Sequence, residues 1–376
     1  MVTEDGGRKE MWSRRGDLAR GVALINESVA KGQADASSPL LPNPESCLTM
    51  RAMFRRRATI LFLFIATLAA QQVLASDILW KPQKTWVFVV GTLEWKDSAA
   101  FASFPKANRR DAQLVRFFRQ KGVSANHIVY LADKQATTSH AQAALDRMLA
   151  QTAPGDLLFF YFTGHGYQSE DGKKTFFATY DASDNRAGWN VDAIVRTIAA
   201  KFRGDRVILA ADCCYSGALV DRVKRLRSRQ SFACFASSTS KDSSTANWTF
   251  TEMLLAGLQG RSFADLNGDH RVTLGEIARS VRDDMRFAED QTSAWIFTGG
   301  FNTNTLIATA QTRSDAAIGR RVEVKSDGAW YKARIIDAKN RRYRVHYFGY
   351  EVADDEWVGP AALRRTGQRP RAGRAR

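Results

Sequence analysis

The stretch RVILAADCCYSG, residues 206–217, decides the predicted fold. Its apolar first half, residues 207–211, breaks abruptly into Asp212, two adjacent cysteines and a Ser-Gly turn. A short apolar run that ends in polar turn residues is typical of a buried strand in a parallel sheet. Because open α/β sheets carry their chemistry at the carboxyl ends of their strands, we expect a functional loop at Asp212 and Cys214.

A second stretch of the same design lies upstream. LLFFYFTGHG, residues 157–166, is an apolar run that ends in His165 between two glycines. Two such strand ends make His165 and Cys214 a plausible thiol–imidazole pair. The simpler interpretation is that both are structural, because free cysteine is among the most buried residue types. Asp212 favours a functional site, since a carboxylate beside a buried strand needs a partner or a ligand charge.

The two motifs together resemble those of the caspase-like cysteine peptidases, and the metacaspase and bacterial branch more than the animal caspases. The resemblance covers roughly residues 86–307. It implies a cysteine-type endopeptidase in which His165 is the general base and Cys214 the nucleophile. It also implies an oxyanion hole formed by the backbone amides of Gly166 and Cys214, and no cofactor for the chemistry itself.

The resemblance further implies a substrate pocket. Asp212 matches the family carboxylate that accepts Arg or Lys before the scissile bond, and we include Thr163, which stands where serine is usual, among the substrate-binding residues. Tyr215 stands where the family has histidine. The alternative function is a catalytically silent scaffold that uses the same fold to bind a protein or polymer. The presence of both His165 and Cys214 favours the enzyme.

Strand and helix patterns alternate around these motifs. We predict further strands at 86–90, 128–131, 176–180, 232–235 and 294–297, and helices at 108–122, 141–150, 191–202 and 250–258. Such alternation predicts an α/β domain with a mostly parallel sheet and helices on both faces. We place this domain at residues 76–310.

Residues 219–230, LVDRVKRLRSRQ, are crowded with basic side chains. We find no apolar face in this pattern and interpret it as a solvated surface loop. In caspase-like enzymes the corresponding stretch links the large and small portions of the fold. With a pocket for basic residues, this linker is also a candidate for self-cleavage.

Residues 265–276, DLNGDHRVTLGE, match an EF-hand calcium loop. Asp265, Asn267 and Asp269 stand at positions one, three and five, and Glu276 stands at position twelve. Hard oxygen ligands at this spacing are those that Ca²⁺ requires. His270 occupies position six, where glycine is usual, although histidine tolerates the left-handed conformation at some cost. Either Ca²⁺ binds here, or the loop is vestigial and keeps only its structural role.

Residues 318–365 predict a separate small all-β unit. The segments GAWYKARI, YRVHYFGY and DEWV resemble the Tudor and chromo-barrel modules of the SH3-like class. In that family an aromatic cage holds a methylated lysine by cation–π attraction. The resemblance assigns the cage to Tyr331, Tyr347 and Tyr350, with Asp354 in place of a fourth aromatic. The alternative is that these tyrosines fill the core of a small barrel. We expect a binding module of unknown ligand.

The two ends of the chain differ in composition from these domains. Residues 1–49 are polar and without periodicity, so we expect disorder or an upstream extension that is not part of the protein. Residues 50–75 combine arginines, an apolar run and small residues, which predicts a signal peptide and export to the periplasm or medium. The alternative is a membrane anchor at 58–75. Residues 366–376 predict a basic disordered tail that meets an anionic polymer.

Composition sets further limits. The chain of 376 residues carries a formal net charge of +16, and its length suggests two domains with extensions. Beyond the predicted signal peptide it has three cysteines, Cys213, Cys214 and Cys234. Three cannot all pair and two are adjacent, so the pattern excludes a disulfide framework.

Overall fold

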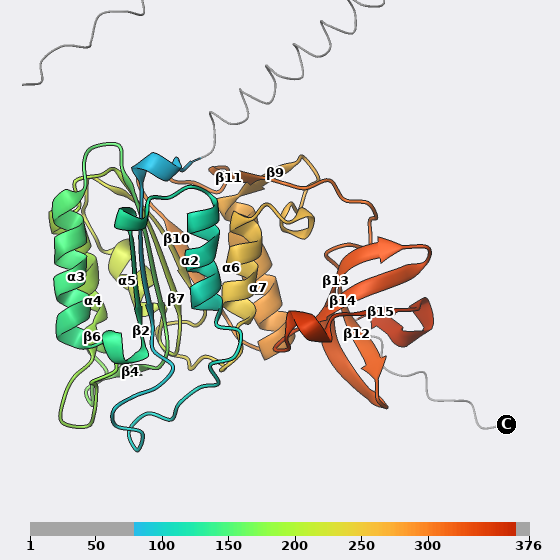
Figure 1. Cartoon of the computed structure of the whole chain (residues 1–376), viewed down its shortest axis with the longest axis horizontal. Coiled ribbons are helices and arrows are strands. Elements are labelled where there is room, and N and C mark those ends of the chain that lie inside the picture. The colour runs from blue at the N-terminus through green and yellow to red at the C-terminus, as the bar shows by residue number, and fades with distance from the viewer. Residues whose placement is uncertain (1–78, 366–376) are drawn as a thin grey trace, which may run out of the picture. The chain divides into compact units, whose positions relative to one another are not determined.

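A six-stranded sheet forms the centre of the fold (Figure 1). The structure, a computed structural model, describes residues 79–365, which all lie in one compact unit. The strand order is β10-β8-β7-β3-β1-β2. The strands are β1 (Thr85–Gly91), β2 (Ile128–Ala132), β3 (Leu157–Thr163), β7 (Arg206–Asp212), β8 (Ser231–Ala236) and β10 (Ala294–Phe297). Only β10 runs antiparallel to its neighbour. The predicted mostly parallel sheet is therefore confirmed.

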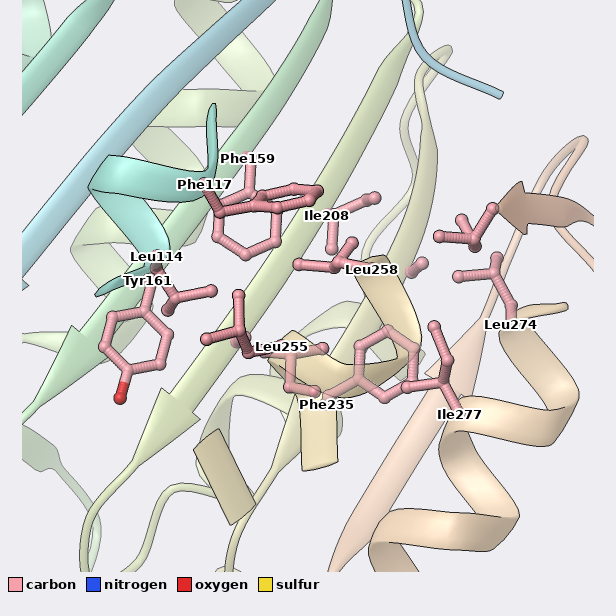
Figure 2. Close-up of a cluster of buried hydrophobic side chains, with 14 of the residues drawn as sticks. Leu114, Phe117, Phe159, Tyr161, Ile208, Phe235, Leu255, Leu258, Leu274 and Ile277 are labelled. Carbon is pink, nitrogen blue, oxygen red and sulfur yellow. The ribbon is translucent and has the colours of Figure 1, made fainter. Parts of the chain in front are cut away.

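Helices cover both faces of this sheet (Figure 1). One face packs against α2 (Arg110–Gln120), α6 (Thr249–Leu258) and α7 (Leu274–Glu289), and the other against α3 (Thr138–Gln151), α4 (Val191–Lys201) and α5 (Ala218–Lys224). Alternate strand residues enter the two cores, so Phe159 and Tyr161 lie in the first and Phe160 in the second. Figure 2 shows the first core. Because both faces are covered, the central strands read as continuous apolar runs.

The prediction of a surface loop at 219–230 is wrong for its first half, which belongs to helix α5. This helix begins at Ala218, and Leu219 and Val223 are buried in the second core. These two apolar residues are four positions apart and share one helix face, which the surrounding basic residues obscured in the sequence. Only the segment 225–230 leaves the helix.

Smaller elements complete the domain. A three-stranded sheet of order β4-β5-β6 follows the His165 loop, and a two-stranded sheet pairs β9 with β11. Their bounds are β4 (Gly166–Gln168), β5 (Thr175–Phe177), β6 (Trp189–Asn190), β9 (Arg271–Thr273) and β11 (Leu306–Thr309). Single 3₁₀ turns lie at Pro82–Lys84, Ala125–His127, Asp133–Gln135, Ser262–Ala264, Val352–Asp354 and Pro360–Ala362.

The C-terminal unit is a curled antiparallel half-barrel. Its strands are β12 (Arg321–Ser326), β13 (Ala329–Lys339), β14 (Arg342–Tyr347), β15 (Glu356–Val358) and β16 (Leu363–Arg365), in the order β15-β14-β13-β12-β16. Its own small core contains Val324, Ala333, Ile335 and Val345. The prediction of a small all-β module is confirmed as an antiparallel half-barrel, whose strand ladder stays open between β15 and β16.

The predictions for the chain ends lie outside the described residues. These are the extension at 1–49, the signal peptide at 50–75 with its alternative anchor, and the tail at 366–376. Within residues 79–365, none of the helices has the length and apolar character needed to cross a bilayer.

Candidate active site

The two motif-bearing strands lie side by side. β3 and β7 pair in register, with Thr163 opposite Asp212, so the loops that follow them leave the sheet at one edge. The loops touch closely at Gly166, where a Cβ atom would lie 2.0 Å from the carbonyl oxygen of Cys214. Only glycine fits this position. The structure therefore brings the His165 loop and the Cys214 loop together, as the sequence predicted.

The imidazole of His165 is held from one side by the backbone. Its Nε2 lies 2.8 Å from the carbonyl oxygen of Ala102, which can only accept, so Nε2 carries the proton. The ring also packs against Trp95 and Phe104, with ring centroids 4.6 and 4.4 Å away. Burial lowers the pKa of His165, and the bond to Ala102 opposes this effect. The neutral ring then keeps Nδ1 as its basic nitrogen.

Cys214 is the accessible thiol among the described cysteines. It is partly exposed, whereas Cys213 and Cys234 are buried. Burial raises the pKa of both buried thiols well above the usual range, which keeps them protonated and unreactive. The Sγ of Cys214 accepts a hydrogen bond from the backbone N–H of Ser244 at 3.1 Å. The geometry favours Cys214 over Cys213 as the reactive thiol.

A serine-rich loop supports the cysteine turn. Ser237 Oγ accepts the backbone N–H of Cys213 at 3.1 Å, and Ser238 Oγ donates to the carbonyl oxygen of Cys213 at 3.0 Å. Tyr215, which follows Cys214, adopts a left-handed conformation with φ 56°. No sequence motif marks these serines, although the polar run after the strand at 232–235 indicates a loop at the same sheet edge.

A cavity of about 170 Å³ adjoins the two loops. Thr163, Gly164 and Asp212 line its floor. Asp212 is buried and its Oδ2 accepts a hydrogen bond from Thr251 Oγ1 at 2.6 Å. Burial raises the pKa of Asp212 to about 7, with the bonds from Thr251 and Ser237 opposing it. A cavity of this size with a buried carboxyl suits one cationic side chain.

Arg110 and Glu252, which carry no sequence motif, also line the cavity, and His346 and Asp355 continue the network behind them. Arg110 on α2 is buried and donates to Glu252 on α6 at 2.5 Å. His346 on β14 bridges Glu252 at 3.2 Å and Asp355 at 2.7 Å. Burial opposes protonation of His346, but the two carboxylates raise its pKa to about 9. Burial likewise acts to raise the pKa of Glu252, yet His346 and Arg110 lower it.

The EF-hand-like loop turns sharply at its fourth and sixth positions. His270 at position six adopts the left-handed conformation with φ 63°, and Gly268 has φ 81°. Asp265 accepts the backbone N–H groups of both residues, at 2.7 and 2.9 Å. The turn that glycine normally supplies is therefore made by histidine.

The other candidate calcium ligands bond within the loop. Asn267 donates to Asp269 at 3.0 Å, and the Glu276 carboxylate accepts from Thr273 at 2.9 and 3.0 Å in a capping box. Across residues 79–365, no three acidic, histidine or cysteine side chains gather as a metal would require. Calcium binding at this loop stays a prediction.

The three predicted cage tyrosines come together on the half-barrel. The ring centroids of Tyr331, Tyr347 and Tyr350 lie 5.8 to 6.0 Å apart, and the rings are tilted by 66 to 89°. Tyr347 is buried in the unit's own core, whereas Tyr350 is 47% exposed. The arrangement serves both as core packing and as an open aromatic surface.

Comparison with known families decides the class of the domain. Residues 109–223, which hold the His165 and Cys214 motifs, match the family described as metacaspase, peptidase C14 domain. Over these residues the chain is similar to metacaspase peptidase domains. The predicted resemblance is confirmed over these residues.

The curated relatives that match the chain are distant metacaspases. Metacaspase-1 of Candida albicans is 28% identical over 125 residues, which cover 28% of each chain. Metacaspase-2 of Trypanosoma brucei brucei is 27% identical over 123 residues, covering 29% of this chain and 35% of that protein. The match thus spans about a third or less of these relatives. A solved caspase-1 from Spodoptera frugiperda aligns with 64% of this chain and 94% of that chain, at 13% identity and a TM-score of 0.37.

Proposed function

We propose that the protein is a cysteine endopeptidase that hydrolyses peptide bonds after Arg or Lys. The observation that carries the proposal is the pairing of β3 with β7, which sets an oriented imidazole and an accessible thiol in adjoining loops. A base fixed by a third group beside a nucleophile is the arrangement that nucleophilic catalysis requires. The similarity to metacaspase peptidase domains supports the same reaction class.

The proposed mechanism assigns one role to each group. His165 Nδ1 takes the proton of the Cys214 thiol, and Sγ attacks the substrate carbonyl carbon. The backbone N–H of Cys214 meets no acceptor within residues 79–365, so it is free to donate to the oxyanion. The N–H of Gly166 is the proposed second donor. Protonated His165 then gives its proton to the leaving amine, and water hydrolyses the thioester. Ala102 accepts the Nε2–H of His165 in both the neutral and the protonated ring, so the ring keeps its orientation.

Asp212 is the proposed specificity group, with Thr163 beside it in the cavity floor. On peptides that differ only in the residue before the fluorogenic group, we expect kcat/KM to be about 10-fold to 100-fold higher for Arg than for Asn, because a charge-assisted bond forms with Asp212. Lys is expected to follow Arg, and Asp to be cleaved slowest because two carboxylates repel. Faster turnover of the Asp peptide than of the Arg peptide contradicts the proposal.

Self-processing is the second part of the proposal. Arg222 lies in α5 and pairs with Asp192 at 2.6 Å, whereas Arg225, Arg227 and Arg229 are exposed beyond the end of the helix. A protease needs extended chain, so we expect cleavage after one of these three arginines. The segment leads into β8 at Ser231, which pairs with Arg206 at the amino end of β7, so it lies at the sheet edge opposite Cys214. We therefore expect one copy of the chain to cleave this segment in another copy.

The expected products of self-processing are two fragments that stay together. They remain associated because β7 and β8, on either side of the cleaved segment, pair along the sheet. Purified wild-type chain should show two bands on a denaturing gel and one species by native sizing, while Cys214→Ala stays whole. The matched control Arg222→Gln should still be cleaved. Cleavage of Cys214→Ala, or an active wild type that stays intact, argues against self-processing.

The competing function is a silent scaffold that binds a cation through the half-barrel. The three tyrosine rings favour it, since aromatic faces at these angles attract ammonium groups. Saturable binding of a trimethyl-lysine peptide, together with no hydrolysis of any peptide in the panel, is the result that supports the scaffold over the enzyme.

A further inference from the structure

The turn after β14 reaches the Asp212 cavity. Gly349, Tyr350 and Glu351 form part of its wall, opposite the strand ends of the peptidase sheet. Gly349 has φ +80°, and a Cβ atom there would lie 3.1 Å from the side chain of Asn247, which also lines the cavity. The glycine lets this turn close against the peptidase domain. The cavity is thus built from both the peptidase domain and the half-barrel.

Buried contacts fix the half-barrel in this place. Arg334 on β13 forms a buried ion pair with Asp284 on α7, and Arg321 on β12 donates to the same carboxylate at 2.7 Å. Phe348, next to Gly349, meets Phe287 edge-on with ring centroids 5.8 Å apart. Breaking a buried ion pair is costly, because it leaves one charge unpaired away from water. The turn is therefore held at the cavity.

The cavity wall carries more negative than positive charge. Arg110 donates to Glu252 at 2.5 Å, and His346 meets the same carboxylate at 3.2 Å, whereas Glu351 has only a 3.8 Å contact with Arg110. Asp212 adds a third acidic group on the floor. A cationic side chain that enters the cavity supplies the missing positive charge.

Tyr350 adds an aromatic surface at the same wall. The side chain of Tyr350 is 47% exposed. Its ring packs edge-to-face against the rings of Tyr331 and Tyr347. Packing of this kind limits the freedom of the ring before any substrate arrives. The exposed part of the ring can therefore contact the aliphatic stem and the charged group of an Arg or Lys side chain of the substrate.

We propose that Tyr350 and Glu351 are specificity-determining residues of the peptidase, so that the half-barrel helps to select a substrate with a cationic side chain in the Asp212 cavity. This inference rests on the proposed function for its substrate class. Glu351 contributes attraction across the cavity, and Tyr350 contributes a cation–π contact at its outer wall. Neither residue touches the reacting bond, so both act on substrate binding.

The kinetic test uses the full chain and the Arg peptide. We expect Tyr350→Ala and Glu351→Gln each to raise KM about fivefold to tenfold, with little change in kcat. This is the effect expected from the loss of one partly shielded contact with a cation. The KM of the matching Asn peptide should stay the same. The matched controls are Trp330→Ala and Glu323→Gln, since both residues lie on the half-barrel and contact Arg364 away from the cavity.

A binding test separates this inference from the proposed hydrolysis. In the Cys214→Ala chain, the Kd of an Arg-ending peptide amide should weaken about fivefold to tenfold on adding Tyr350→Ala or Glu351→Gln, and stay unchanged with either control. Suppose that the Cys214→Ala chain binds the peptide with these Kd changes but the wild-type chain cleaves no peptide. The role of Tyr350 and Glu351 in binding then stands, and the proposed peptidase activity is wrong. Equal Kd values in all five chains, or no binding by the parent at millimolar peptide, overturn the inference.

Discussion

Cys214→Ala is expected to abolish hydrolysis of the Arg peptide, whereas Cys213→Ala keeps most of it. The two thiols are neighbours in sequence, but Cys214 is accessible and Cys213 is buried with a raised pKa. Loss of a nucleophile typically lowers kcat by about 10⁴-fold or more. Removal of a buried sulfur leaves only a small cavity in the second core, which costs stability but no chemistry.

The measurement combines turnover with covalent labelling. A peptidyl electrophile ending in Arg should modify wild type and Cys213→Ala at Cys214, as located by mass spectrometry, and leave Cys214→Ala unmodified. His165→Ala is the matched variant that keeps the thiol but removes its base, and its labelling should slow sharply. A dead Cys213→Ala chain that is folded by circular dichroism would falsify the assignment of the nucleophile.

The strand ends were predictable because their signal is local and strong. Apolar runs of five to seven residues that stop at polar turns identify β3 and β7, and parallel strands place their carboxyl ends at one edge. His165 and Cys214 followed from this pattern together with the resemblance. Helix α5 was missed because its apolar signal is only Leu219 and Val223 among many charges.

The partners of the site residues were not predictable, because they are distant in sequence and carry no motif. Ala102 holds His165 through a backbone carbonyl, which any residue supplies. Arg110 and Glu252 are 142 positions apart, and Glu252 and His346 are 94 apart. Charged residues on a helix surface are usually solvated, so the sequence could not show that these meet. The docking of the half-barrel on the cavity depends on such pairs.

Asp212→Asn is expected to remove a pH-dependent step in activity on the Arg peptide. The pKa of Asp212 is about 7 because burial opposes its charge, with Glu289 adding to the rise and the hydroxyls of Thr251 and Ser237 opposing it. Above this pH the carboxylate is charged and attracts Arg, so kcat/KM should rise as pH passes through about 7. The pKa of His165 is lowered, so its own rising limb lies further to acid.

The same substitution gives a readout of Asp212 that is independent of catalysis. Because the folded-state pKa is raised from 3.8 to about 7, wild type loses stability as pH rises through this window, by at most about 4 kcal/mol. Asp212→Asn has no such loss, so its melting temperature should exceed that of wild type at pH 8 and approach it near pH 4. At pH 8 its kcat/KM for the Arg peptide should nevertheless fall about 10-fold to 100-fold, since a charge-assisted bond is lost. If Asp212→Asn is more stable than wild type at pH 8 but loses its preference for the Arg peptide, the buried charge of Asp212 serves substrate binding and not folding. An unchanged step near pH 7 in Asp212→Asn assigns the titration to another group.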